Sequence, residues 1–446
     1  MRCDPGSDRV SAAPPTATSP LADWLGYLET LHPKAIALGL DRVAAVAARL
    51  QIAPSCPVIT VTGTNGKGST CAYLDAMLRA GGYRVGLYTS PHLLRYTERV
   101  RIDGIEVDDA AMAEAFATVE RVRGGVALTY FEFGTLAALW LFARARLDAL
   151  ILEVGLGGRL DAVNVIDADV AIITSIGIDH IDYLGGTRES IGFEKAGVLR
   201  VARPGVCADP DPPQSLLAHA EAIGAPLFRV GTDFGYLIEG DRWQYWVRRG
   251  KEIVRRHGLP LPALRGAIQV RNAAAALTGL ELLRGRLDVP MGAVRNGLVG
   301  VDWPARFQVL PGRPAIILDV AHNPQAASIL AANLGEMGYF PNTTAVFSIL
   351  ADKDIAGVAG VMKRRIDRWL IAPSGGARGA TAARIGAALA EAGIGGEAVF
   401  ACADITQALA RAREEAGEAD RIVVFGSFVT VAAALVALER TRRPGH

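Results

Sequence analysis

The stretch VTGTNGKGST, residues 61–70, combines glycines, a lysine and hydroxyl side chains in the manner of a phosphate-binding loop. The common mononucleotide signature has four residues between its two glycines and a Ser or Thr directly after the Lys. Here two residues separate Gly63 from Gly66, and a further glycine lies between Lys67 and Ser69. The spacing alone leaves two alternatives open: a nucleotide site of another subclass, or a tight turn with a solvated lysine.

The context of this loop favours the phosphate site. The β-branched run PVITVTG, residues 57–63, predicts a buried strand, and residues 69–82 carry apolar side chains at helical spacing. A glycine turn between a strand and a helix directs backbone N–H groups and the positive helix end at one point, where an anion is stabilised. Lys67 adds a full positive charge, so the loop is interpreted as nucleotide-binding.

Two further polar residues follow predicted strands. Glu153 ends the run ALILE, as a carboxylate does when it holds Mg²⁺ at the edge of an NTPase sheet, and His180 follows the next apolar run. The carboxyl ends of parallel strands lie at one edge, so both side chains can reach the cleft of the glycine loop. Other roles stay open: Glu153 capping a turn or pairing with Arg159, and His180 as a hydrogen-bonded loop residue.

A second group of the same kind lies near residue 320. Asp319 and His322, in LDVAHNP, follow a buried run and precede a predicted helix that begins near Pro324. Such residues could face a nucleotide held between two domains, where ligand clefts commonly lie. Helix capping by Asn323 is the alternative, and it does not exclude this role.

The elements that must position these residues form two α/β units. Apolar strands alternate with helical patterns from residue 57, which predicts a parallel sheet covered on both faces. Residues 205–264 mix short strands with turns and suggest a mixed-sheet extension. We expect a disordered tail over residues 1–20, an N-terminal P-loop domain over 21–298, a linker over 299–304 and a smaller α/β domain over 305–446.

Composition and charge exclude several classes of protein. Lys and Arg number 47 against 46 Asp and Glu, so no overall attraction draws the chain to nucleic acid. The five cysteines have no metal-type spacing and fit free thiols in a reducing compartment. The N-terminus lacks a signal-type apolar region, and the apolar runs fall short of the roughly 18 residues that cross a bilayer. We expect a cytoplasmic protein without nucleic-acid or membrane partners.

Several motifs together resemble one family. In order along the chain they are VTGTNGKGST, LYTSPHLLRYTERVRI, LEVGLGGRLDAVN, TSIGIDHIDYLG, EKAGV, RNAAAAL and LDVAHNP. Their order and spacing resemble folylpolyglutamate synthases and dihydrofolate synthases of the Mur ligase superfamily, over about residues 24–435. The resemblance implies an ATP-binding domain and a C-terminal Rossmann-like domain. It also implies a reaction in which ATP phosphorylates a pterin-linked carboxylate and the amino group of L-glutamate attacks the acyl phosphate.

The resemblance assigns roles to single positions. Residues that match ATP contacts are Gly63, Asn65, Gly66, Lys67, Gly68, Ser69, Asn272, Arg306, Asp319 and His322. Residues that match magnesium ligands are Ser90, Glu153 and His180, although spacing alone would give the metal to Ser69. Positions near the pterin are matched by Phe131 and Asp161, and Ala305 stands where relatives often carry Gly.

Lys195, in EKAGV, matches a lysine that is carbamylated in many relatives, where it binds a second Mg²⁺. From the sequence alone it is an exposed lysine beside Glu194. With Lys67 and His180, it completes the set of residues that the resemblance implies for catalysis.

The resemblance implies dihydropteroate or folates, L-glutamate and ATP as small-molecule substrates, and we expect a monomer that carries both activities. The motifs do not decide between dihydrofolate synthesis, folate-tail extension and both. One alternative is a Mur-type cell-wall ligase that binds a UDP-sugar peptide. Another is a nucleotide-controlled switch, for which ADKD at 351–354 is the nearest approach to a guanine reader.

Overall fold

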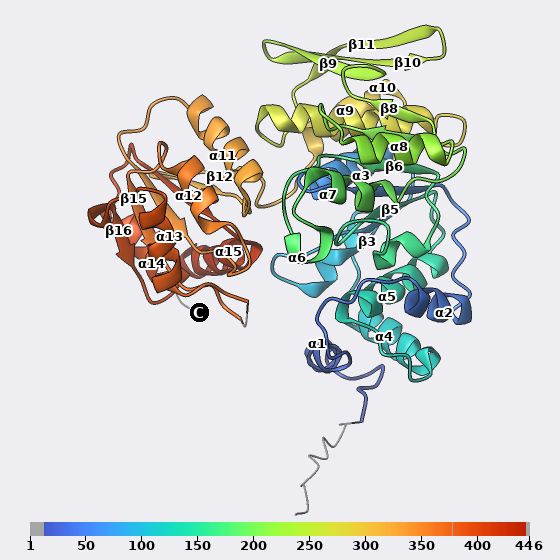
Figure 1. Cartoon of the computed structure of the whole chain (residues 1–446), viewed down its shortest axis with the longest axis horizontal. Coiled ribbons are helices and arrows are strands. Elements are labelled where there is room, and N and C mark those ends of the chain that lie inside the picture. The colour runs from blue at the N-terminus through green and yellow to red at the C-terminus, as the bar shows by residue number, and fades with distance from the viewer. Residues whose placement is uncertain (1–12, 377, 443–446) are drawn as a thin grey trace, which may run out of the picture.

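The computed structural model describes residues 13–376 and 378–442, which form two α/β units side by side (Figure 1). Of the tail expected over residues 1–20, the first twelve lie outside the described residues. The first helix begins at Leu21. From within this helix, the indole of Trp24 donates a hydrogen bond at 3.0 Å to the carbonyl of Thr16, which precedes it.

The first unit is built on an eight-stranded sheet with the order β4-β3-β2-β5-β1-β6-β7-β8. The strands are β1 (Val58–Thr62), β2 (Val85–Tyr88), β3 (Val100–Ile102), β4 (Ile105–Glu106), β5 (Ala149–Glu153), β6 (Val170–Ile173), β7 (Gly205–Cys207) and β8 (Leu227–Arg229). β2, β3 and β4 pair antiparallel, and the other neighbours pair parallel. Val61 of β1 pairs with Glu153, and Thr62 pairs with Ile173, so the residues after β1, β5 and β6 share one edge.

Helices cover both faces of this sheet because its central strands are buried on both sides. On one face lie α3 (Lys67–Ala80), α9 (Ala267–Leu282) and α10 (Met291–Gly300). On the other lie α1 (Leu21–Thr30), α2 (Asp41–Arg49), α4 (Asp109–Arg123) and α5 (Tyr130–Arg144). At the β7 and β8 end lie α7 (Arg188–Ala196) and α8 (Gln214–Ala222), after the short α6 (Ile181–Leu184).

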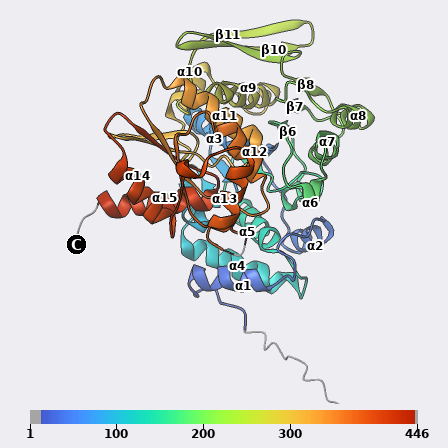
Figure 2. The same ribbon diagram turned by 60° about the vertical axis from the view of Figure 1, so that its left-hand side comes forward.

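The segment 205–264 differs from the expected mixed-sheet extension. β7 and β8 continue the main sheet in parallel, whereas β9 (Phe234–Glu239), β10 (Arg242–Arg249) and β11 (Glu252–Pro260) form a separate antiparallel sheet beside α9. This sheet lies at the opposite end of the unit from α1 and α4 (Figures 1 and 2). In β10, buried Trp243, Tyr245 and Val247 alternate with more exposed residues, as in a sheet that packs on one face only.

The second unit has a six-stranded sheet with the order β12-β13-β17-β14-β15-β16. The strands are β12 (Gln308–Leu310), β13 (Ala315–Leu318), β14 (Thr343–Phe347), β15 (Arg368–Ile371), β16 (Val399–Ala401) and β17 (Arg421–Phe425). The pair β12 and β13 is antiparallel, and the remaining neighbours are parallel.

Helices also sandwich this second sheet. One face packs against α11 (Pro324–Glu336), α12 (Ile355–Met362) and α13 (Ala382–Glu391), and the other against α14 (Ile405–Glu415) and α15 (Phe428–Arg442). The expected α/β architecture, a P-loop unit followed by a smaller Rossmann-like unit, is therefore confirmed. Among the helices of the described segments, none combines the length and the apolar character that crossing a membrane requires.

Candidate active site

A cavity of about 800 Å³ lies between the two units. Every residue that the sequence analysis proposed for the site lines it, from both units. These residues are Gly63, Asn65, Gly66, Lys67, Gly68, Ser69, Ser90, Phe131, Glu153, Asp161, His180, Lys195, Asn272, Arg306, Asp319 and His322. Positions far apart in the sequence therefore meet at one place.

The glycine loop after β1 is tight, and two of its glycines have no room for a side chain. Gly63 has a φ of 151°, and a Cβ on it would lie 1.9 Å from Thr174 Oγ1. Gly66 has a φ of 90°, and its Cβ would lie 2.8 Å from Asn272 Oδ1. The loop can therefore deliver its backbone N–H groups to the cavity at the start of α3.

Replacing Gly63 with alanine is expected to lower the free energy of unfolding by about 1–3 kcal/mol, because the strained φ and the contact with Thr174 act together. Urea unfolding followed by circular dichroism measures the change. Gly82→Ala is the matched control, because Gly82 also has a positive φ, 85°, but nothing lies within 4 Å of its Cβ position. An equal loss in both variants would assign the effect to backbone strain and not to the close contact.

Lys67 is the first residue of α3, and its ammonium group turns back onto the loop. Its Nζ donates to the Gly63 carbonyl at 3.0 Å and to the Thr64 carbonyl at 3.3 Å. A cation is thus held at the helix N-terminus, where the helix dipole and the loop N–H groups also favour an anion. The side chain of Ser69, one turn into the helix, is buried beside it.

Glu153 ends β5 beside this cation. Its Oε2 accepts a hydrogen bond from the backbone N–H of Ser90 at 3.0 Å. Burial raises the pKa of its carboxyl group, and the charge of Lys67 opposes that effect. Arg159, considered as a partner of Glu153, pairs with Glu194 at 2.7 Å instead. The second oxygen, Oε1, lies 3.7 Å from the Cβ position of Gly68 and accepts no hydrogen bond from the described residues.

His180 precedes α6 in the left-handed conformation, with a φ of 53°. Burial lowers its pKa to about 4, against the opposing carboxylate of Asp179, so the imidazole is neutral at pH 7. A neutral imidazole is the form that binds a metal. Within residues 13–376 and 378–442, however, no group of three or more His, Cys, Asp or Glu side chains is arranged to hold an ion.

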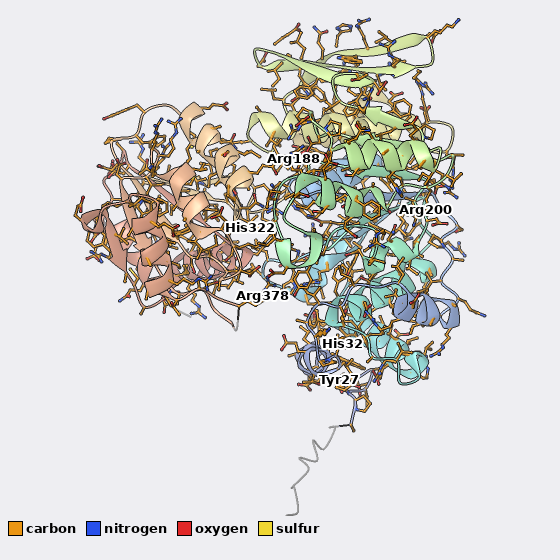
Figure 3. The ribbon with its side chains drawn as sticks, viewed as in Figure 1. Tyr27, His32, Arg188, Arg200, His322 and Arg378 are labelled. Atoms are coloured by element: carbon orange, nitrogen blue, oxygen red, sulfur yellow. The ribbon has the colours of Figure 1, made fainter. Side chains whose placement is uncertain are left out.

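Asp179 joins the two units and was not among the residues that the sequence predicted. It accepts from Lys353 Nζ at 2.5 Å and Asn323 Nδ2 at 3.1 Å, and its Oδ2 lies 3.4 Å from Nε2 of His322. Burial opposes ionisation, but His322, His180 and Lys353 hold the pKa of Asp179 well below its usual range. Figure 3 shows His322 where the second unit faces the first.

Lys353 was also missed as a site residue, although it lies in ADKD, which follows a buried strand just as Asp319 does. Its position after β14, at the same edge as the residues after β13, is the signal that could have identified it.

Further contacts tie the second unit to the glycine loop: Asn65 Nδ2 donates to Gln325 Oε1 at 2.7 Å, and Asn323 Nδ2 donates to Asn65 Oδ1 at 3.1 Å.

Arg306 enters the cavity from the segment between the units. Asp319 holds this segment by accepting from the backbone N–H of Phe307 at 2.8 Å. Ala305 has a φ of 61°, in the left-handed region that favours glycine. The Arg306 guanidinium lies 5.1 Å from the centroid of the Phe428 ring, and burial lowers its pKa.

Phe131 and Asp161 lie in the part of the cavity formed by the first unit. The Phe131 ring packs over Gly155, whose Cβ would lie 2.6 Å from it. Asp161 accepts from the backbone N–H groups of Leu156 at 2.9 Å and Val163 at 3.0 Å, and burial raises its pKa to about 7.

The expectation that Lys195 is exposed was wrong. Its side chain is buried, with 3% of the residue exposed, because the last turn of α7 faces the cavity while Glu194 turns to Arg159. Burial lowers the pKa of Lys195 to about 7, and the positive charge of Lys67 adds to the shift. A substantial neutral fraction of this amine therefore exists at neutral pH.

These features define a class of protein. A phosphate-binding loop, a carboxylate and a neutral imidazole meet cations from a second α/β unit across one cavity. This is the arrangement of an enzyme that acts on a nucleotide and a second substrate between two domains.

Comparison with known proteins identifies the class more closely. Residues 61–278 match the Mur ligase middle domain, and residues 305–428 match the Mur ligase glutamate ligase domain. The dihydrofolate synthase/folylpolyglutamate synthase of Escherichia coli (strain K12) is 45% identical over 432 residues, which cover 97% of this chain and 98% of that protein. The protein of the same name from Haemophilus influenzae is 41% identical and covers 93% of this chain and 97% of its own length.

Solved structures agree with this result. The E. coli FolC in complex with DHPP and ADP has a TM-score of 0.90 and 44% identity, covering 96% of this chain and 100% of its own. A bifunctional folylpolyglutamate synthase/dihydrofolate synthase with Mn, AMPPNP and L-glutamate bound has a TM-score of 0.88 and 46% identity, with the same coverage. The chain belongs to the dihydrofolate synthase/folylpolyglutamate synthase family of Mur ligases, as its motifs predicted.

Proposed function

We propose that this enzyme uses ATP to join L-glutamate to dihydropteroate and to the γ-carboxylate of folates. The observation that carries the proposal is the single cavity of about 800 Å³ that gathers the glycine loop, Glu153, His180 and the cations of the second unit. Bound ATP would supply the phosphoryl group that turns the acceptor carboxylate into an acyl phosphate. The neutral amine of glutamate then attacks the acyl carbon, the bond from that carbon to the phosphate oxygen breaks, and amide, phosphate and a proton are the products.

Residues of this chain supply the electrostatic part of that reaction. Lys67 and the loop residues Gly63, Asn65, Gly66, Gly68 and Ser69 are assigned to the phosphates, where Lys67 and the N–H groups at the start of α3 stabilise charge without reorganising. Arg306 adds a cation from the junction, and Asp319 holds its segment in place. Asn272 and His322 are assigned to further nucleotide contacts.

Ser90, Glu153 and His180 are proposed to hold Mg²⁺, which would neutralise phosphate charge when bound. Mg²⁺ prefers oxygen ligands, and Glu153 and Ser90 supply them. Oε1 of Glu153 accepts no hydrogen bond from the described residues, and the backbone N–H of Ser90 donates to Oε2. The Ser90 backbone N–H fixes the rotation of the carboxylate, and burial keeps His180 neutral.

Lys195 is proposed to carry a carbamate that serves a second Mg²⁺. Burial and the neighbouring Lys67 lower the pKa of Lys195 to about 7, which leaves neutral amine to attack CO₂. We expect ¹³C-labelled bicarbonate to give a carbamate resonance in the NMR spectrum that is absent from Lys195→Ala. Lys251→Ala, which removes an exposed lysine of the β10–β11 hairpin, should keep the resonance. A spectrum without a carbamate in the wild-type protein would contradict the assignment.

Phe131 and Asp161 are assigned to the pterin. An aromatic face can stack on a flat heterocycle, and a carboxylate can accept from its N–H groups. We propose that the enzyme acts as a monomer, since every assigned residue lines a single cavity and the reaction needs no residue from a second copy.

A substrate-swap assay tests the proposed function. ADP release is measured with glutamate plus dihydropteroate, and then with glutamate plus reduced mono- and diglutamyl folates. Turnover with both acceptor types is the expected result. Turnover with UDP-muramoyl substrates and amino acids alone would support a cell-wall ligase instead, and phosphate release that ignores glutamate would support a nucleotide switch.

A further inference from the structure

Arg99 is a buried cation that the assigned roles do not use. It is the last residue of a short 3₁₀ helix, Tyr96–Arg99, and 8% of it is exposed, yet it lines the cavity. Its guanidinium lies 5.0 Å from the centroid of the Tyr96 ring and 5.7 Å from that of Tyr130. No ion pair among the described residues includes it. A buried charge without a counter-charge is costly, which points to an anion that reaches it from the cavity.

Two other cations that line the cavity have a carboxylate partner. Lys353 pairs with Asp179 at 2.5 Å, and Arg378 pairs with Asp352 at 3.0 Å. Arg99 instead donates from Nε to Nδ1 of His92 at 2.9 Å. Because Arg99 can only donate, Nδ1 of His92 accepts, and the proton of a neutral His92 ring is on Nε2. His92 also lines the cavity, so the pair offers two kinds of donor to one anion.

The position of Arg99 indicates which anion this is. The Arg99 carbonyl accepts from the backbone N–H of Thr89 at 3.0 Å, which places Arg99 beside Tyr88 and Ser90 at the end of β2. Tyr88 lies 6.1 Å from Phe131, ring centroid to ring centroid, on the side assigned to the pterin. Glu153 lies beside the glycine loop on the phosphate side. Arg99 therefore lies between the two, where the group that joins the pterin to the phosphoryl donor must be.

We propose that Arg99 and His92 form the subsite that binds the carboxylate of the pterin-linked acceptor and orients it toward Lys67. A guanidinium offers several N–H donors in a plane, which matches a carboxylate better than an ammonium group does. One carboxylate oxygen, held in this way, forms the bond to the γ-phosphorus while the bond from that phosphorus to the bridging oxygen breaks, and ADP leaves with the electron pair. The subsite rests on the proposed function, since it names the acceptor of that reaction.

Titration of the full-length protein with two probes tests the subsite. The probes are dihydropteroate and the same compound with a carboxamide in place of the carboxylate, and binding is followed by calorimetry. The wild-type protein is expected to bind the carboxylate about tenfold or more tightly than the carboxamide. In Arg99→Gln this preference should fall close to one, with the affinity for ADP unchanged. Arg95→Gln is the matched control, because Arg95 is exposed and pairs with Asp109 at 3.1 Å outside the cavity.

An Arg99→Gln protein that keeps the wild-type preference, or that loses ADP affinity instead, would overturn the subsite. Circular dichroism establishes that the variant folds. If it does not fold, His92→Ala decides with Arg99 still in place: a preference reduced about threefold or more supports the subsite, and an unchanged preference overturns it.

Wild-type turnover of dihydropteroate with glutamate is measured in parallel. No turnover would contradict the proposed function, whereas turnover with an unchanged carboxylate preference in Arg99→Gln would contradict the subsite alone.

Discussion

Replacing Lys67 with alanine is expected to lower kcat by about 10²–10³-fold with dihydropteroate and with folates alike. The ammonium group is held at the start of α3 by the carbonyls of Gly63 and Thr64, beside buried Glu153. Phosphoryl transfer depends on fixed positive charge around the moving group, and the acceptor does not alter that requirement. The loss should therefore be uniform across acceptors, as measured by coupled ADP release.

Lys363→Ala is the control for this variant. Lys363 belongs to the second unit, does not line the cavity, and donates from Nζ to the Ala392 carbonyl at 3.1 Å. Its replacement should leave kcat within about twofold of the wild-type value, since surface changes of this kind have small effects. Activity of Lys67→Ala near the wild-type level would remove Lys67 from the phosphate site.

The sequence predicted those parts of the fold that depend on local pattern. β1, the glycine loop and α3 follow one another in a stretch where the apolar period changes from strand to helix, so each could be identified without knowledge of its neighbours. For residues 205–264, which contain β9, β10 and β11, the sequence predicts only a mixed-sheet extension. The strands themselves could be predicted from the sequence. The sheet that each strand joins depends on pairing with residues distant in the sequence, which a local pattern does not specify.

Site residues could be predicted where a charged side chain stands at the end of a buried strand. They could not be predicted where tertiary packing sets the burial or the pairing of the side chain. Glu153 ends a buried strand and Asp319 follows one, and both were identified from that position. Lys195 was assigned from a motif, yet its burial depends on how α7 packs, which no local pattern encodes. The contact of Asp179 with Lys353 joins residues that are 174 positions apart, and the unpaired charge of Arg99 is recognised only once its surroundings are known.

Contacts between the units explain why these residues have to be considered together. Asp179 and Asn65 both bond to the second unit, through Lys353, Asn323 and Gln325. The cations of the second unit are therefore fixed relative to the glycine loop by polar contacts at the cavity itself. A displacement of the second unit would change the charges around the phosphates and the hydrogen bonds of the loop at the same time.

Glu153→Gln is expected to lower kcat by about 10²–10³-fold and to raise the Mg²⁺ concentration needed for half-maximal activity. Glutamine keeps the size of the side chain and can accept from the Ser90 N–H, so the strand end should keep its shape. It removes the charge that the proposed ion requires. Lys67 would then lose its neighbouring carboxylate, and Arg306 would keep only that of Asp319. Steady-state kinetics over a range of Mg²⁺ concentrations measures both quantities.

The control is Glu415→Gln, which removes a carboxylate of the second unit that pairs with Arg411 at 2.9 Å and Arg368 at 2.7 Å, away from the cavity. Its Mg²⁺ dependence should match that of the wild-type protein. A Glu153→Gln enzyme with lowered kcat but an unchanged Mg²⁺ dependence would mean that Glu153 acts by balancing Lys67 and Arg306. The ion would then have to be held by other oxygens, and Ser90 would lose the neighbour on which its assignment depends.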